Sequence, residues 1–338
     1  MAAIPGIPAA STSAAPHGPS DYLQERIRWH WPESVFWIAT LAVYLAFPSY
    51  LQLASQVAIA ALFALSLDLI LGYAGIVSLG HAAFFGIGAY AAGIASKYGW
   101  GEPLSLAAFG AVLAGLAGYA TSFIVARFRH LALIMITLGI GLLLYEAANN
   151  ASWLTGGADG LQGVNIKPLF GVFRFDLYGR TAYAYSLAVL FLSFLFARRL
   201  IHSPFGLALR GIRENPVRMP ALGAPSAAHI RRIYTIGAVM AGLAGALLTE
   251  TTSTVALEVF SFQRSADVLV MLILGGAGRL YGGILGAVVY MVARDQFSGV
   301  NPQFWYFWIG LMLVLVVVLV PNGLLGGLTR WTSWLKRA

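Results

Sequence analysis

The chain has 338 residues, of which 59% are hydrophobic and only 10% are charged, and its mean hydropathy is +0.77. Soluble globular domains carry about 25% charged residues, so this composition excludes an ordinary water-soluble protein. The net charge of +8 does not indicate nucleic-acid binding, because the basic residues lie at the ends of apolar runs rather than on a soluble module. With no cysteine and six dispersed histidines, the sequence offers neither disulfides nor a pattern of metal ligands. We expect an all-α, polytopic membrane protein.

The apolar runs predict about eight to ten transmembrane helices. They follow a Pro-, Ala- and Ser-rich segment, residues 1–32, which is expected to be a disordered cytoplasmic tail without signal-peptide features. The helices are expected at about 35–50, 53–72, 74–96, 104–126, 131–148, 182–200, 233–252, 265–278, 281–298 and 304–321. The pair 265–278 and 281–298 is short, and it is interpreted either as two spans or as half-helices that enter the membrane and return. Residues 33–329 then form the transmembrane domain, and residues 330–338 form a basic cytoplasmic tail.

Lysine and arginine positions predict the orientation in the membrane, because short cytoplasmic loops carry an excess of both. If the N-terminus is cytoplasmic, fourteen of the twenty-one basic residues lie on the inner side. These fourteen are Arg26, Arg28, Arg127, Arg129, Arg198, Arg199, Arg210, Arg213, Arg218, Arg231, Arg232, Arg330, Lys336 and Arg337. We therefore expect a multi-pass membrane protein with both termini in the cytoplasm.

Two connections are long enough to have structure of their own. Residues 149–181 are rich in glycine, asparagine and aspartate and are expected to form a loop on the outer side of the membrane. Residues 200–232 are strongly basic, contain four prolines and are expected to form a cytoplasmic loop. Because proline cannot continue the interior of a helix, this second loop predicts two short helices, at about 205–214 and 217–223.

The charged residues of the second loop admit two interpretations. Arg210, Arg213, Glu214 and Arg218 form either a solvated face that follows the positive-inside rule or an ion-pairing surface for a soluble partner. In the second interpretation, three apolar side chains would anchor that partner. They are Phe205, Leu209 and Ile212.

Motifs for ATP hydrolysis and for several common kinds of catalysis are missing from the sequence. The lysines are Lys97, Lys167 and Lys336, and none follows the glycine that a phosphate-binding loop requires. The best candidate for a GxGxxG pattern, GIGAYA at residues 86–91, ends in alanine and lies in an apolar run. A membrane-embedded enzyme would need clustered catalytic residues, which the sequence does not show. We therefore expect a chain that is not an enzyme.

Residues 72–93, GYAGIVSLGHAAFFGIGAYAAG, combine six glycines with one histidine and no charged group. In lipid, small residues let helix backbones approach closely. The first nine residues could instead break the helix at membrane depth, which is tolerated only where the backbone is buried in protein or lines a cavity. Asp68 is expected either to bond backbone freed by these glycines or to line the transport path. His81 is expected either to bridge helices as a neutral imidazole or to line the path and titrate.

Six distinctive runs occur in order along the chain. They are GYAGIVSLGHAAFFGIGAY (72–90), LTGGADGL (154–161), SPFGLALRGIREN (203–215), GLAGAL (242–247), LILGGAGRLYGGILGA (272–287) and PNGLLGGL (321–328). Together they resemble the branched-chain amino acid ABC transporter permease family, specifically its LivM-type subunits, over about residues 50 to 328.

This resemblance implies roles for particular residues. Residues 203–223 would be the coupling loop that seats in a groove of an ATPase. The residues there that match the family pattern are Gly206, Arg210, Arg213, Glu214 and Gly223. The stretch 72–90 would lie in the membrane core near the substrate path. The candidates for the translocation path or for core packing are Asp68, Gly75, Ser78, His81, Phe84, Phe85 and Tyr90.

The implied protein is an inner-membrane permease subunit of an ATP-driven importer of branched-chain or related amino acids. Its implied partners are a LivH-like second permease, two cytoplasmic ATP-binding subunits, a periplasmic solute-binding protein and membrane lipid. The chain itself would hold no cofactor, because ATP and Mg²⁺ bind to the partner ATPases. One alternative is the same architecture importing urea, amides or aromatic acids. A second alternative is a secondary transporter or channel that needs no ATPase.

Overall fold

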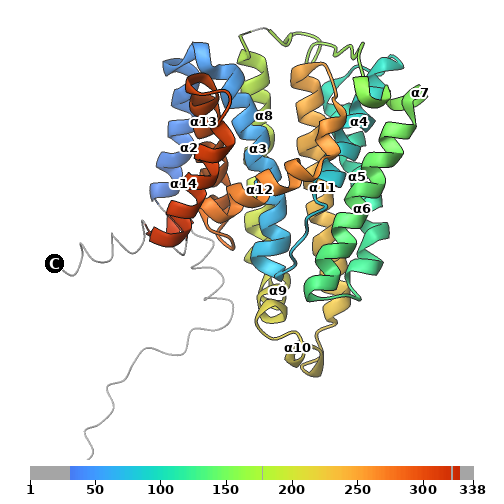
Figure 1. Cartoon of the computed structure of the whole chain (residues 1–338), viewed down its shortest axis with the longest axis vertical. Helices are drawn as coiled ribbons and strands as arrows, with labels where there is room; N and C mark the ends of the chain where they lie inside the picture. The colour runs from blue at the N-terminus through green and yellow to red at the C-terminus, as the bar shows by residue number, and fades with distance from the viewer. Residues whose placement is uncertain (1–30, 177, 321–322, 328–338) are drawn as a thin grey trace, which may run out of the picture.

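A helix lies at each of the ten positions where the sequence predicts one (Figure 1). The computed structural model describes residues 31–176, 178–320 and 323–327. The predicted tails, 1–32 and 330–338, lie outside the described residues, except that the first described helix already begins at Trp31. The ten helices are α2 (Trp31–Ala46), α3 (Leu51–Leu67), α4 (Ala82–Lys97), α5 (Pro103–Val125), α6 (His130–Asn150), α8 (Arg180–Ile201), α11 (Ser226–Thr252), α12 (Phe262–Gly275), α13 (Leu280–Val300) and α14 (Trp305–Leu319).

Short elements connect these helices. They are η1 (Pro48–Tyr50), the π-helical turn η2 (Asp68–Tyr73), α7 (Ser152–Thr155), η3 (Gly157–Asp159), α9 (Pro204–Glu214), α10 (Arg218–Ala221) and η4 (Leu257–Phe260). Helices α9 and α10 confirm the two short helices predicted for the basic loop. Extended pairing in the described part of the chain consists of two isolated bridges, Leu161 with Val255 and Leu169 with Phe173.

Six helical segments of the described chain are long and apolar enough to cross a membrane. They cover residues 48–73, 103–125, 130–150, 180–201, 226–252 and 305–327. Helices α12 and α13 pass the same test only as a pair, and they meet at a bend of 114°. In Figure 1, α12 lies across the long axes of α3 and α11. The bend favours the half-helix interpretation of this pair over two separate spans.

Helices α4, α5 and α11 pack along one another, and we call them the glycine bundle. A Cβ atom on Gly110 of α5 would lie 2.8 Å from the Gly88 carbonyl oxygen of α4, and one on Gly242 of α11 would lie 3.0 Å from the Gly110 carbonyl oxygen. Such backbone contact needs residues without side chains. In a membrane, where burying apolar surface does not drive helices together, it is this close approach that stabilises them.

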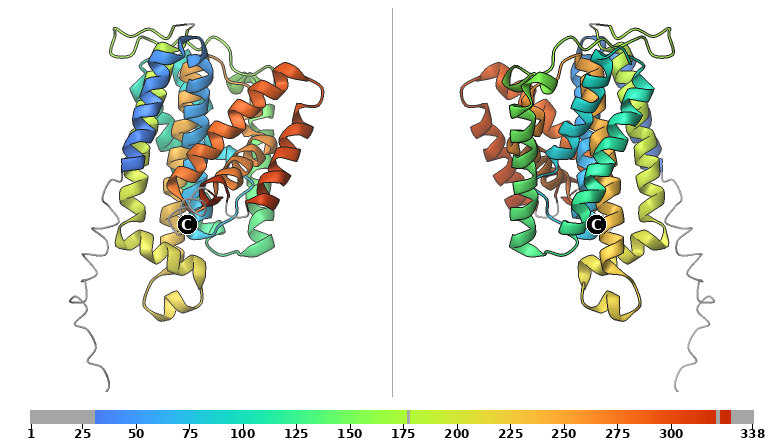
Figure 2. Two further views of the ribbon diagram at one scale, coloured as in Figure 1. Left: turned by 90° about the vertical axis from the view of Figure 1, so that its left-hand side faces the viewer. Right: turned by 90° about the vertical axis from the view of Figure 1, so that its right-hand side faces the viewer.

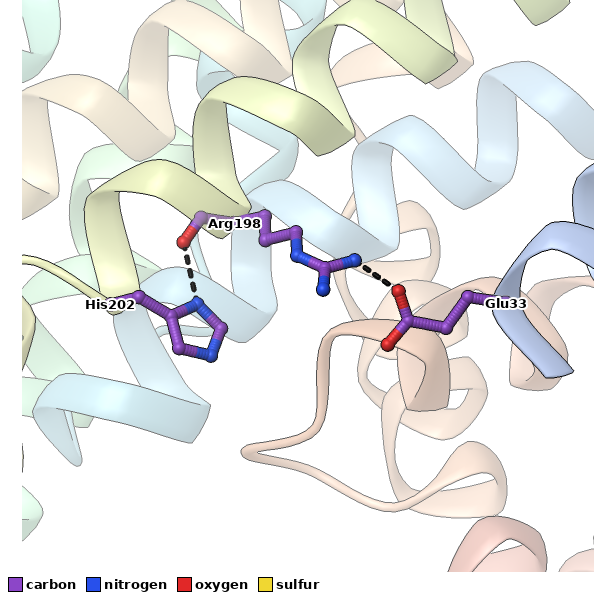
Figure 3. Close-up of polar contacts among 3 residues, drawn as sticks. All are labelled: Glu33, Arg198 and His202. Atoms are coloured by element: carbon purple, nitrogen blue, oxygen red, sulfur yellow. Dashed lines mark hydrogen bonds and ion pairs between the residues drawn. The ribbon is translucent and has the colours of Figure 1, made fainter. Parts of the chain in front are cut away.

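Helix α2 lies against α8 through polar contacts, and Figure 3 shows those near its first turn. Glu33 in the first turn of α2 forms an ion pair with Arg198 of α8. The Arg198 carbonyl in turn hydrogen-bonds to Nδ1 of His202 at 2.8 Å. Near the start of α8, the Tyr183 hydroxyl donates to the carbonyl of Thr40, in the middle of α2, at 2.7 Å. These contacts fix α2 on the outside of α8.

The two ends of the bundle differ in shape. Helices α9 and α10 project beyond the other helices at one end, in each of the side views of Figure 2. The connection that contains α7 and η3 covers the opposite end (Figure 1). The start of α2 and the end of α14 both point toward the α9 end. The predicted loops 149–181 and 200–232 therefore lie at opposite ends of the described structure.

Candidate functional site

The predicted helix over 74–96 is wrong in its first eight residues. Helix α3 runs into the π-helical turn η2, and the chain is then non-helical until α4 begins at Ala82. Gly75 has φ +72°, a left-handed conformation that favours glycine. A Cβ on Gly72 would overlap the Asp68 carboxylate and lie 2.8 Å from the Gly278 Cα. The glycines thus break the span where other parts of the chain surround it, as the sequence allowed.

Asp68 connects this break to a second one. Its side chain is fully buried, and its Oδ1 accepts a hydrogen bond from the Gly278 backbone N–H at 2.7 Å. Gly278 lies in the bend between α12 and α13 and has φ +81°. Asp68 therefore bonds irregular backbone, as in the first of its two interpretations. That backbone belongs to a different pair of helices, 210 residues further along the chain.

Arg213 of α9 reaches the same place from the projecting end. Its guanidinium donates to the Gly72 carbonyl, and a Cβ on Gly278 would lie 3.0 Å from the same Nη1 atom. One turn earlier, the Arg210 guanidinium lies 5.3 Å from the centre of the Tyr73 ring. We call Asp68, Gly72, Arg213 and Gly278 the junction, because they connect α9, the broken span and the bent pair.

A cavity of about 530 Å³ opens at the junction. It is lined by Gly72, Tyr73, Arg210, Arg213, Glu214 and Gly278. The charged residues of α9 therefore contact the broken span of their own chain, and the outer part of Arg213 stays exposed. The structure places Arg210, Arg213 and Glu214 together, between the core and the projecting helices.

The prediction that Phe205, Leu209 and Ile212 of α9 anchor a soluble partner is wrong. Leu209 and Ile212 are buried against their own chain, and Phe205 stacks on the His229 ring at 5.4 Å between centroids. Gly206 is also buried, because α9 passes closely over the end of α8: a Cβ there would lie against the Ile201 backbone. This stripe at i, i+4 and i+7 is the face that attaches α9 to the core.

A different set of residues faces outward from α9 and α10. Leu207 is 40% exposed, Val217 77% and Leu222 68%. Arg218 is also exposed, and Gly223 ends the turn after α10 with φ +84°. Sequence reasoning missed these three apolar side chains. The available signal was that they fall outside the stripe of Phe205, Leu209 and Ile212.

His81 stands at the start of α4 and is fully buried. Its Nε2 shares a hydrogen bond with the Ser66 hydroxyl at 2.8 Å, and its ring stacks on Phe63 at 5.3 Å between centroids. Both partners belong to α3. The Ala82 N–H, next in the chain, donates to the Ser265 hydroxyl of α12 at 3.0 Å. His81 therefore bridges α3 and α4 close to where α12 crosses them.

The other path candidates lie in different surroundings. Ser78 is buried, and Phe84 meets the Tyr234 ring edge-on at 5.5 Å. Tyr90 stacks on Phe260 at 5.4 Å. Phe85 alone of the seven candidates lines a second cavity, of about 280 Å³, between α3, α12 and α13. The seven residues thus divide between helix packing, the junction and one cavity wall.

Sequence reasoning did not find several partners of these residues. Ser66 and Ser265 are ordinary polar residues within apolar helices, and no local pattern distinguishes them. Gly278 was visible only as part of a glycine-rich connection. Arg264, which lies 5.9 Å from the Phe85 ring centre, precedes the predicted start of its helix at 265, so no predicted membrane span contains it.

Comparison with known proteins identifies the family of the chain. The family model described as "Branched-chain amino acid transport system / permease component" matches residues 49–317. The chain is 29% identical over 320 residues to the high-affinity branched-chain amino acid transport system permease proteins LivM of Salmonella typhimurium and of Escherichia coli. Each alignment covers 87% of this chain and 75% of the relative.

A third relative is archaeal and matches over a shorter stretch. It is named "Probable branched-chain amino acid transport permease protein LivM" of Methanocaldococcus jannaschii, and it is 27% identical over 153 residues, which cover 41% of this chain and 44% of the relative. No solved structure matches the chain. The family model covers most of the chain, including the broken span, α9 and the bent pair. The chain is a multi-pass membrane protein and belongs to the family of permease components of branched-chain amino acid transport systems.

Proposed function

We propose that this chain is one permease subunit of an ATP-driven importer, and that α9 and α10 couple it to a partner ATPase. The hydrogen bond from Arg213 to the Gly72 carbonyl carries this proposal, because it connects the projecting helices directly to a break in a membrane span. The exposed apolar residues Leu207, Val217 and Leu222 supply the surface on which the ATPase docks. ATP and Mg²⁺ bind to that partner, and this chain provides no nucleotide site.

The proposed assembly contains a LivH-like second permease, two ATP-binding subunits and a periplasmic solute-binding protein. The end with α9 and α10 faces the cytoplasm, because it carries the arginine-rich loop 200–232. The opposite end, with loop 149–181, receives the solute-binding protein. The N-terminus and C-terminus are then both cytoplasmic, in an inner membrane.

The junction explains how movement of α9 changes the shape of the permease. When the ATPase displaces α9, Arg213 pulls on the Gly72 carbonyl, and Asp68 carries the displacement to Gly278. The broken span and the bent pair thus respond together. The ATPase drives the change only by binding the two shapes of the permease with different affinity.

The proposed substrates are leucine, isoleucine and valine. The names of the relatives support this choice, and urea, short amides and aromatic acids are the alternatives on the same architecture. Uptake of labelled leucine in competition with unlabelled urea, acetamide and phenylalanine separates these possibilities. Unlabelled valine is the reference competitor. If urea, acetamide or phenylalanine competes more strongly than valine, the substrate class is reassigned to that of the stronger competitor.

The coupling role is tested by Arg213→Gln in the complete transporter, reconstituted in vesicles with its partner chains. We expect ATP hydrolysis stimulated by the loaded solute-binding protein to continue while uptake falls about tenfold, because a charged donor to a backbone carbonyl is lost. Arg129→Gln is the control, since Arg129 is exposed and far from α9 in sequence. Unchanged uptake in the Arg213 variant would refute the coupling role. Transport in vesicles that lack every partner chain would indicate a secondary transporter or channel instead.

A further inference from the structure

The cavity of about 280 Å³ has one strongly polar wall inside a membrane protein. It lies between α3, α11, α12 and α13, with Phe85 of α4 at its base. Its polar lining residues are Gln56, Arg264, Asp267, Arg294, Asp295 and Ser298. Ionisable groups are costly at membrane depth and usually face a wet cavity or a functional partner there. Pockets for drug-sized ligands measure about 300 to 1,000 Å³, so this one suits a smaller molecule.

The two arginines of this wall have no carboxylate partner. Arg264 and Asp267 are three residues apart on one face of α12, yet no ion pair within 4 Å involves Arg264 or Arg294 in the described part of the chain. The Arg264 Nε is buried and makes no hydrogen bond. Arg294 instead lies 5.3 Å from the Trp305 ring centre. A positive pole is therefore available to an anionic group.

Asp267 forms the opposite pole. It is 8% exposed, and its Oδ1 accepts hydrogen bonds from the Tyr290 hydroxyl at 2.8 Å and from the Gln263 amide at 3.1 Å. Both donors are neutral, so the negative charge of a carboxylate here is oriented but not cancelled. Arg264 and Asp267 thus present opposite charges side by side.

The remaining wall is apolar. It consists of Leu53, Ile59, Ala60, Phe63, Phe85, Leu248, Val268, Met271 and Met291. Phe63 and Phe85 touch at 4.7 Å between ring centroids, and Phe63 also stacks on His81. Methionine and aromatic side chains adapt to branched aliphatic groups of different shape. The apolar wall accordingly accepts a hydrophobic side chain of moderate size.

The cavity lies on the half of the molecule away from the coupling helices. Arg294 is fourteen residues beyond the start of α13, which places it about 21 Å along that helix from the bend. Leu53 and Gln56 are likewise near the start of α3, at the end opposite Asp68. The cavity therefore lies on the side of the junction toward the end with loop 149–181.

We propose that this cavity binds the transported amino acid as a zwitterion: Arg264 and Arg294 hold its carboxylate, Asp267 holds its ammonium, and Phe63, Phe85 and Met271 surround its side chain. The inference rests on the proposed function, since it assumes that this chain transports an α-amino acid. Under this proposal, residues of α12 and α13 recognise both charged groups of the transported amino acid, its carboxylate and its ammonium. Because Phe63 stacks on His81, the bound side chain lies next to the non-helical segment between η2 and α4, which leads to the junction.

The test uses photoreactive leucine, an α-amino acid with a diazirine side chain, on the complete transporter in nanodiscs. Cross-linked peptides are mapped by mass spectrometry. We expect labels on α3, α4 and α12 around Phe63, Phe85 and Met271. Leucine should compete with this labelling, whereas N-acetyl-leucine and leucinamide, which each lack one charge, should compete at least about tenfold more weakly.

Two kinds of variant make the test specific. Arg264→Gln and Asp267→Asn should each lower the labelling about tenfold or more, because each removes a charged partner of the ligand. Ala60→Phe should lower it by filling the cavity while leaving both charges in place. Arg129→Gln is the matched control and should label as the unmodified chain does. Binding-protein-stimulated ATP hydrolysis, measured on each variant, shows that it is folded and assembled.

Labelling outside the cavity, or undiminished labelling in Arg264→Gln, would overturn the proposal. So would equal competition by leucine and leucinamide. Labelling requires neither ATP hydrolysis nor uptake, so it tests the cavity separately from the importer function. A transporter that labels as expected but takes up no amino acid would refute the proposed function and leave the binding site standing.

Discussion

The glycine bundle and the junction are built in opposite ways. In the bundle, α4, α5 and α11 touch through backbone atoms over several turns, at positions such as Gly88, Gly110 and Gly242. At the junction, a few hydrogen bonds from Asp68 and Arg213 hold two irregular segments together. Close-packed backbones allow little adjustment, whereas hydrogen bonds can exchange one partner for another. The comparison suggests a rigid body beside a region that changes shape.

The largest effect is expected from a substitution inside the bundle. A Cβ on Gly245 of α11 would overlap the Phe85 carbonyl and lie 2.9 Å from the Ala89 nitrogen. Gly245→Val should therefore destabilise the chain by about 3 kcal/mol or more, because two backbones would have to separate. Gly139→Val on α6 is the control, since a Cβ there meets no atom within 4 Å. Thermal unfolding of the purified chain checks both, and a stable Gly245 variant would contradict the rigid-body description.

The junction should respond with a smaller loss of stability and a larger loss of transport. Asp68→Ala leaves the half-buried Gly278 N–H without an acceptor, which costs about 1 to 2 kcal/mol. Asp68→Asn keeps an acceptor oxygen and should retain most of the stability. We expect uptake to fall strongly in the alanine variant while the complex still assembles. If the two variants have the same stability and the same uptake, the hydrogen bond to Gly278 does not explain how Asp68 contributes to stability and transport.

The smallest effect is expected at His81, which lies between the two regions. His81→Ala removes the bond to Ser66 and the stack on Phe63, and should destabilise the chain by about 1 to 2 kcal/mol. His81→Gln keeps a polar group in reach of Ser66 and should assemble and transport normally. The measurement is uptake at several pH values. A pH profile of the glutamine variant that differs from that of the unmodified chain would favour the titrating interpretation of His81 over the bridging one.

The fold was predictable from the sequence to the extent that local patterns determine it. Apolar runs predicted the helix positions, with ends that differ from the structure by up to eight residues, and prolines predicted the two short helices of the basic loop. The glycines of 72–80 indicated a possible break, but a continuous helix from 74 was equally compatible with the local pattern. Only the contact of Gly72 with Gly278, far apart in sequence, decides between the two.

The candidate site was less predictable, because its residues are defined by partners on other elements. Leu209 and Ile212 form a clear amphipathic stripe, yet the stripe does not say whether it faces the core or a second protein. Arg264 lies at the polar start of a helix, where an arginine usually has no special role. Its position over the Phe85 ring depends on the contact between α12 and α4, which are far apart in sequence.

The hydrogen bond between Asp68 and Gly278 also has a consequence for the order of folding. During synthesis, Asp68 enters the membrane long before Gly278 is made, since 210 residues separate them. A backbone N–H that lacks an acceptor in lipid costs several kcal/mol, so the bend of α12 and α13 is unfavourable until it meets the finished α3. The C-terminal helices therefore settle last. A chain truncated before Gly278 would instead leave the buried Asp68 carboxylate without this backbone donor.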